Sequence, residues 1–359
     1  MSDTARGADM RPQTKNSGIG LGLVAAAWRR GARLERFWFV PAPASRLAVV
    51  RVLICAYALI WLVACAPIVL PSLWFPADRF EPVGITTLIA APLAPALGIA
   101  IWLLTGAAGV AVLLGWRFRM IAPVFGLGLL WVTSYRSSWG MIFHTENLLV
   151  IDALILAILP ASDAWSLDAR RDPDLRARGR ALHWRYGWGL KLMATITVLT
   201  YVLAGIAKLR NAGSAWLGGE VLLSHVAWDN LRKTELGAFH SPIGALLSAY
   251  PLVFVPLAWL SMVLELGGPL ALVHRRLAQI WALGMWAFHV GVLVIMAIAF
   301  SYPLSGVAFA PMFAVERPVE ALTVWLRRRR PNSVLLRLLP NPAEPPTARL
   351  SPSPAPIPP

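Results

Sequence analysis

The sequence has few charged residues and almost no cysteine. Charged residues make up only 14% of its 359 positions and hydrophobic residues 57%, with a mean hydropathy of +0.62. A soluble domain of this length does not have so apolar a composition, so the sequence predicts a membrane protein. The two cysteines, Cys55 and Cys65, are ten residues apart in one apolar run, about 15 Å along a helix, which is too far for a disulfide.

Several catalytic signatures are also missing. The sequence contains no Gly-rich phosphate loop, no CxxC pair and no HExxH, and it has no internal repeat. These absences argue against nucleotide hydrolysis and zinc proteolysis, and no metal is expected.

Long apolar runs dominate what is present. Several are long enough to cross the roughly 30 Å hydrocarbon layer as helices of about 20 residues, and none alternates as a barrel strand does. The predicted fold is therefore all-α, a polytopic integral membrane helical bundle. We predict eight spans, of which the fourth and eighth are short enough to be half-spans: residues 47–69, 96–115, 120–137, 147–161, 188–208, 251–273, 277–299 and 302–316.

Lysine and arginine are unevenly divided between the predicted loops. If the N-terminus is cytoplasmic, the inside segments carry 25 of them and the outside segments 6, while Arg51 and Lys191 fall within spans. This split follows the positive-inside rule at every loop, so both termini are predicted to be cytoplasmic in the plasma (inner) membrane. It also explains the net charge of +15 without nucleic acid, because these arginines flank spans and meet anionic lipid.

Three segments are expected along the chain. Residues 1–46 are expected to form a basic cytoplasmic segment that includes a cytoplasmic or interfacial helix at about 18–28, and residues 47–316 the membrane domain. Residues 317–359 are basic and then Pro-rich, which predicts a disordered cytoplasmic tail.

Polar residues in or beside apolar runs are the candidate functional groups, because they are costly in a membrane. The candidates are His144, Glu146, Lys208, Glu220, His225, Glu265 and His289. Each also has a structural interpretation. Lys208 can extend to the headgroups, His144 can be an exposed loop residue, Glu265 can join two helices and His289 can be a satisfied core histidine. Asp152 is interpreted as structural.

The segment after Lys208 argues against a purely structural lysine. The chain continues as "WLGGEVLLSHV", which is amphipathic and too short to span, so it is expected to lie back on the outer interface and cover Lys208. A lysine covered by apolar groups loses solvation for its charged form and can act as a base near neutral pH.

At these residues the sequence resembles the vitamin K-dependent γ-carboxylase superfamily and its bacterial relatives with a horizontally transferred transmembrane (HTTM) domain. "YVLAGIAKLRNAGSAWLGG" contains the aromatic Tyr201, an Ala-Gly pair ending at Gly205, Lys-Leu from Lys208, and Trp216 with a glycine three residues on. "RVLICAYALIWL", "HTENLLVIDALILAILPASDAWSLDA" and "FHVGVLVIMAIAFSYPLSGVAFAPMF" agree in the same order. The resemblance covers about residues 30–316.

The resemblance implies a site. Lys208 matches the lysine that deprotonates the vitamin K hydroquinone, His144 the histidine that supports the oxygenated intermediate, and His289 a histidine of the late helix. Tyr201, Gly205, Trp216 and Glu265 are then expected at the quinone-binding site. The implied cofactor is a reduced, vitamin K hydroquinone-like quinone, with O₂ and CO₂ as co-substrates. The site is expected toward the extracytoplasmic face, which agrees with the arginine count.

Two departures limit what is transferred. The connection from Lys208 to Trp216 is longer than in the animal enzyme, and the chain ends soon after the eighth span, where the carboxylase continues into a large extramembrane domain. The sequence is therefore expected to be a bacterial short form, without propeptide-directed carboxylation of a protein.

Three functions remain open. The first is a quinol-dependent, carboxylase-like membrane enzyme acting on an unknown peptide or small-molecule substrate. The second is a quinone-binding redox or accessory subunit that works with a membrane or soluble partner protein. The third is a non-enzymatic transporter or scaffold in which Glu265 and His289 line a path. The first is preferred.

Overall fold

The structure is a computed structural model that describes residues 34–329, and these residues are mainly helical, with almost no β-strand. Five of the described helices are long and apolar enough to cross a membrane. They are α2 (Ala44–Ser72), α3 (Pro95–Leu114), α4 (Phe118–Ser137), α8 (Trp184–Ala212) and α13 (Arg275–Met296). The protein is therefore a multi-pass helical membrane protein, which confirms the predicted fold class.

Two of the remaining predicted spans contain shorter apolar helices. The fourth contains α5 (Asn147–Ala157), and the sixth contains α12 (Phe254–Leu266) between the 3₁₀ turns η3 (Pro251–Val253) and η4 (Gly268–Leu272). Pro251 and the Gly267-Gly268-Pro269 run explain the turns of the sixth segment, because they favour breaks over a continuous helix.

The prediction of one eighth helix at residues 302–316 is wrong. This stretch contains only the short elements α14 (Ser301–Leu304) and η5 (Val307–Met312). Gly306 between them has a φ of +77°, in the left-handed region, and Pro311 has no backbone donor, so a continuous α-helix cannot form. A helix that was not predicted, α15 (Glu316–Arg329), then follows in place of the expected start of the tail.

Two predictions cannot be compared with the structure. The cytoplasmic or interfacial helix at about residues 18–28 and the Pro-rich tail after Arg330 lie outside the described residues. The number of membrane crossings and the side on which each terminus lies stay predictions.

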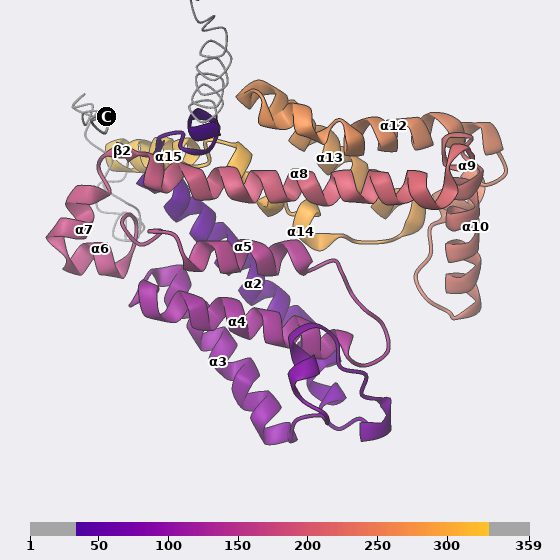
Figure 1. Cartoon of the computed structure of the whole chain (residues 1–359), viewed down its shortest axis with the longest axis horizontal. Helices are drawn as coiled ribbons and strands as arrows, with labels where there is room; N and C mark the ends of the chain where they lie inside the picture. Colours follow the sequence, from indigo (N-terminus) through magenta and orange to yellow (C-terminus); the bar gives the residue numbers. More distant parts are fainter. Residues whose placement is uncertain (1–33, 330–359) are drawn as a thin grey trace, which may run out of the picture.

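The connecting segments gather at two ends of the helical bundle (Figure 1). At one end, β1 (Ala42–Pro43) pairs antiparallel with β2 (Leu182–His183), close to α6, α7 and α15. At the other end lie α9 and α10 (Figure 1). The remaining short elements are α6 (Leu167–Arg171), α7 (Pro173–Arg178), α9 (Ser214–Leu217), α10 (Glu220–Glu235), α11 (Pro242–Leu247), η1 (Ala77–Arg79) and η2 (Gly84–Leu88).

The first and last described helices of the bundle are joined at the β1–β2 end. Arg46 at the start of α2 donates to the carboxylate of Glu316 from Nε at 3.0 Å and from Nη2 at 2.8 Å. This forked geometry holds α15 beside α2. Nearby, Ser45 donates to Glu320 at 3.1 Å, so two residues of α15 are fixed in place.

The "SLDA" stretch is an anchor at the same end of the bundle. The Asp168 carboxylate accepts from the backbone N–H groups of Arg117 and Phe118, each at 2.9 Å, at the start of α4. Ser166 caps α6 by accepting from the N–H of Ala169 at 2.8 Å. The motif therefore ties the segment after α5 to the turn between α3 and α4, far along the bundle from Lys208.

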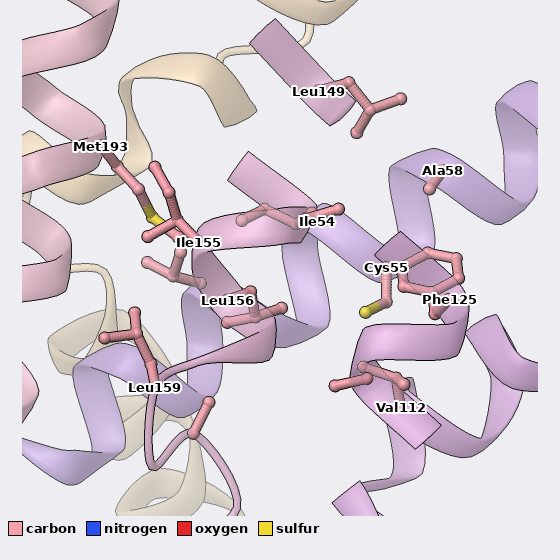
Figure 2. Packing of buried hydrophobic residues seen from close by; sticks show 14 of the residues in the cluster. Ile54, Cys55, Ala58, Val112, Phe125, Leu149, Ile155, Leu156, Leu159 and Met193 are labelled. Atoms are coloured by element: carbon pink, nitrogen blue, oxygen red, sulfur yellow. The ribbon is translucent and has the colours of Figure 1, made fainter. Parts of the chain in front are cut away.

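The main apolar core lies where α2, α3, α4, α5 and α8 meet. Figure 2 shows part of it, including Ile54, Cys55 and Ala58 of α2, Val112 of α3, Phe125 of α4, Leu156 of α5 and Met193 of α8. Cys55 is a buried free thiol in this cluster, and Cys65 is a half-buried free thiol. A second cluster joins α8 to η4, α13 and η5, and it supports the part of α8 that leads to Lys208.

Candidate functional site

Lys208 lies in the last turn but one of α8, where it pairs with a buried carboxylate of α12. Its Nζ donates to Oε1 of Glu265, and the side chains of Lys208 and Glu265 are 23% and 3% exposed. The lysine is therefore partly open, whereas its partner is enclosed by protein. A carboxylate in such an apolar place is costly unless it is paired, so the pair fixes the relative position of α8 and α12.

Gly205 allows these two helices to approach each other. It lies one turn before Lys208, and a Cβ added there would be 2.9 Å from Cδ2 of Leu266 and 3.1 Å from Cβ of Glu265. Small residues permit close packing of membrane helices. The glycine of the signature is thus a packing residue that lets Lys208 reach Glu265.

Two aromatic rings enclose the Lys208 ammonium. Its Nζ lies 4.9 Å from the ring centroid of Trp216 and 5.6 Å from that of Phe288 on α13. These distances are within the range of cation–π attraction. Trp216 is itself buried, and its Nε1 donates to Ser261 Oγ on α12 at 3.3 Å.

The segment after Lys208 covers it through the short helix α9. Gly213, with a φ of +55°, ends α8 and turns the chain so that Trp216 returns over the lysine. Gly219 has a φ of +82°, and a Cβ there would lie 2.7 Å from the backbone of Phe254, so the turn packs directly on α12. The long amphipathic helix α10 starts after this turn, so the cover over the lysine is α9 rather than α10.

His289 forms a second buried pair beside the first. Its Nε2 lies 2.7 Å from Oη of Tyr201, and both side chains are buried. Tyr201 is two turns before Lys208 on α8, and its ring packs on Trp281 and Phe309. Phe288, which contacts Lys208, is next to His289 in the chain. One turn of α13 therefore contacts both the Lys208–Glu265 pair and Tyr201.

His144 reaches this group through Phe300. It lies in the exposed loop between α4 and α5, with its ring centroid 6.0 Å from that of Phe300, which in turn lies 5.2 Å from the ring of His289. The structure thus places His144 at the edge of the group, in contact with Phe300 rather than with Lys208.

Glu146 holds the loop that carries His144. Its buried carboxylate accepts from Trp61 Nε1 at 3.1 Å, Arg136 Nη1 at 3.0 Å and Thr145 Oγ1 at 2.6 Å. Arg136 also lies 3.9 Å from the ring centroid of Phe143. Glu146 is therefore fully occupied by protein donors, which makes it a positioning residue.

The other sequence candidates lie outside the Lys208 pair. The His225 ring is 6.2 Å from that of Trp216, and Glu220 begins α10 on the exposed surface. Asp152 is fully buried and accepts at Oδ2 from the hydroxyl of Tyr302 at 2.8 Å, while its Oδ1 has no partner among the described residues, so its structural role stays a prediction. Three residues of the site were not predicted from the sequence: Phe288, Phe300 and Ser261. Of these, only Phe288 could have been found, because it lies next to the candidate His289 in the chain.

Two buried polar atoms of the site have no protein partner among the described residues. They are Oε2 of Glu265 and Nδ1 of His289. A buried polar atom without a hydrogen bond is costly, so such atoms point to a ligand or an ordered water. Within residues 34–329, no group of three His, Cys, Asp or Glu side chains is arranged to hold a metal ion.

Comparison with known proteins identifies the family. The model of the HTTM domain matches residues 39–316, which include every residue of the site described above. No curated protein and no solved structure matched this chain. The protein therefore belongs to the HTTM domain family, which is associated with vitamin K-dependent carboxylase-like membrane proteins.

Proposed function

We propose that this protein is a quinol-activating membrane enzyme in which the Lys208–Glu265 pair takes a proton from a quinol hydroxyl. The observation that carries the proposal is the pairing of a partly open amine with a buried carboxylate whose second oxygen has no partner within residues 34–329. Such a pair is a proton acceptor within reach of a ligand. His289 and, at the edge, His144 complete the proposed site, and the substrate of the overall reaction is unidentified.

The Lys208–Glu265 pair can accept one proton from a ligand whether the pair is neutral or ionised at the start. If Lys208 is a neutral amine beside a protonated Glu265, Nζ takes the ligand proton directly. If the pair is an ammonium and a carboxylate, Nζ passes a proton to Glu265 as it receives the new one. Both routes end with an ammonium at Lys208 and a neutral carboxyl at Glu265. The positive charge is then free to stabilise an anionic ligand oxygen, which favours the transfer.

The residues at the site fit a quinol. The rings of Trp216 and Phe288 give flat apolar surfaces beside Lys208, and Glu265 Oε2 and His289 Nδ1 are available for hydrogen bonds. These are the features of a small-molecule site with few polar groups on an apolar wall. When bound, a reduced naphthoquinone supplies the hydroxyl proton and the two electrons needed for reaction with O₂.

We further infer that the site faces the extracytoplasmic side of the plasma membrane. The C-terminal end of α8, which carries Lys208, lies beside α9 and α10, and the arginine-rich segments around α6, α7 and α15 lie at the opposite end (Figure 1). The positive-inside rule supports placing the arginine-rich end in the cytoplasm.

The experiment is an assay for quinone epoxide. Purified protein receives chemically reduced naphthoquinol and then O₂, and mass spectrometry detects the product. In the reaction without a carboxylation substrate, one quinol and one O₂ give one epoxide and one water. Epoxide from the parent protein and not from Lys208→Ala is expected. A folded parent that binds quinones but forms no epoxide would instead favour an accessory quinone-binding subunit, and proton flux lost in Glu265→Gln but kept in Lys208→Ala would favour a transporter.

A further inference from the structure

We propose that a groove at the β1–β2 end of the bundle binds the phosphate headgroup of an anionic phospholipid through Arg185. The groove is lined by Phe39, Ile158, Pro160, Trp184, Arg185 and Trp188. It lies where the first turn of α8 meets the chain that follows α5, and it is separate from the Lys208 site.

The wall of the groove is apolar and open. Trp184 is 45% exposed, Phe39 46% and Ile158 67%, and the rings of Phe39 and Trp184 meet edge to face at 5.1 Å. Tryptophan is enriched where membrane proteins cross from hydrocarbon to headgroups. The wall is therefore suited to the glycerol and upper acyl region of a lipid.

Arg185 supplies the charge that selects a phosphate. It is the charged residue of the groove, and no described carboxylate pairs with its side chain. Asp163, near the start of α8, accepts at Oδ2 from the hydroxyl of Tyr186 at 2.9 Å and forms no ion pair with Arg185 in the described part of the chain. A planar guanidinium binds phosphate oxygens through two parallel hydrogen bonds.

The surrounding sequence is basic. Between residues 175 and 191 the chain carries no acidic residue and five basic ones, Arg176, Arg178, Arg180, Arg185 and Lys191, of which Arg185 alone lines the groove. A site with an apolar wall and a positive charge matches an amphiphile with a phosphate head, because a soluble anion would leave the aromatic wall without a partner. The occupant to which we commit is an anionic phospholipid.

The test measures lipid binding to the full chain purified in detergent. Native mass spectrometry follows titration with phosphatidylglycerol or phosphatidylcholine for the parent, Arg185→Gln and Arg180→Gln. Arg180 is exposed and outside the groove, so it is the matched control for charge. We expect the parent to prefer phosphatidylglycerol, Arg185→Gln to lose roughly tenfold in that preference, and Arg180→Gln to keep it.

Two further measurements make the result decisive. Arg185→Lys keeps the charge but not the forked geometry, so its preference should lie between those of the parent and Arg185→Gln. Inorganic phosphate at millimolar concentration should not displace the lipid. Equal phosphatidylglycerol binding by Arg185→Gln and the parent, or displacement by inorganic phosphate, would overturn the proposal.

Discussion

The two lysines of α8, Lys191 and Lys208, donate hydrogen bonds to different kinds of acceptor. Lys191, near the start of the helix, donates to the backbone carbonyl of Leu272 at 2.8 Å and lies 4.0 Å from the ring centroid of Phe37. Lys208, near its end, donates to the carboxylate of Glu265 and lies 4.9 Å from the ring centroid of Trp216. Each lysine therefore has one hydrogen-bond acceptor, and Lys208 has a second nearby ring, that of Phe288, at 5.6 Å.

The acceptor separates a structural lysine from a candidate base. A backbone carbonyl accepts a hydrogen bond but does not take a proton under these conditions, so Lys191 can only tie α8 to η4. A carboxylate can take and return a proton, and one oxygen of Glu265 has no donor among the residues that the structure describes. The comparison indicates that the ability of a lysine in an apolar helix to act as a base depends on its hydrogen-bond partner and not on burial alone.

The largest expected effect concerns charge-conserving changes of the two lysines. Lys208→Arg should lower the rate of epoxide formation by about 100-fold or more, because a guanidinium does not give up its proton. Lys191→Arg should leave the rate close to that of the parent, since a carbonyl accepts equally from a guanidinium. The measurement is product per minute by mass spectrometry, with circular dichroism to check the fold. Comparable losses in both variants would remove the distinction between the lysines.

A second effect concerns stability. Lys208→Met leaves the Glu265 carboxyl buried without its cation and should cost about 3 kcal/mol of unfolding free energy, whereas Lys191→Met loses one hydrogen bond to a carbonyl and should cost about 1 kcal/mol. The double variant Lys208→Met/Glu265→Met should recover most of the first loss without recovering activity. Thermal unfolding in detergent measures all three. A double variant no more stable than Lys208→Met would contradict a coupled pair.

A third effect tests the contact between α8 and α12. Gly205→Ala places a methyl group 2.9 Å from Cδ2 of Leu266 and 3.1 Å from Cβ of Glu265, so the Leu266 side chain and the adjoining part of α12 must shift, at a cost of about 2 kcal/mol and with a lower rate. Gly106 on α3 is the matched control, because a Cβ there meets nothing within 4 Å. Unfolding temperature and epoxide rate are compared for the two variants. Equal unfolding temperatures and equal rates for the two variants would show that Gly205 is not needed for the pairing of Lys208 with Glu265.

The smallest effect is expected at the neighbouring pair. Tyr201→Phe removes the hydroxyl that lies 2.7 Å from His289 Nε2 and should cost about 1 kcal/mol and lower the rate several-fold. Tyr186→Phe removes a hydroxyl bond to Asp163 at the opposite end and serves as the control. Tyr186→Phe should lower the unfolding free energy by a similar amount and leave the rate of epoxide formation unchanged. A rate loss in Tyr186→Phe equal to that in Tyr201→Phe would attribute both to general loosening.

Much of the fold could be predicted from composition and hydropathy. Long apolar runs indicated membrane helices, and five of them form helices of spanning length. The eighth span was predicted wrongly because hydropathy does not register the break at Gly306, where the backbone adopts a positive φ. The helix α15 was missed because its charged and apolar residues read as the beginning of a tail.

The candidate site was predictable where its residues are close in sequence. Gly205, Lys208 and Trp216 lie within one short stretch, and the cover by the following segment was inferred from the apolar character of that stretch. The pairing of Lys208 with Glu265 was not predicted, because 57 residues separate them and only the packing of α8 on α12 brings them together. The contact of His144 with Phe300 likewise depends on tertiary structure.

The most direct measurement is an anaerobic titration of reduced naphthoquinol into the purified protein, followed by absorbance. Without O₂ the proton transfer is isolated from all later chemistry. The parent and Lys191→Arg are predicted to produce the absorbance of the deprotonated quinol, while Lys208→Arg binds the quinol but shows the spectrum of its protonated form. Deprotonation in Lys208→Arg, or its absence in a parent protein that binds the quinol, would contradict the assignment of Lys208 as the base.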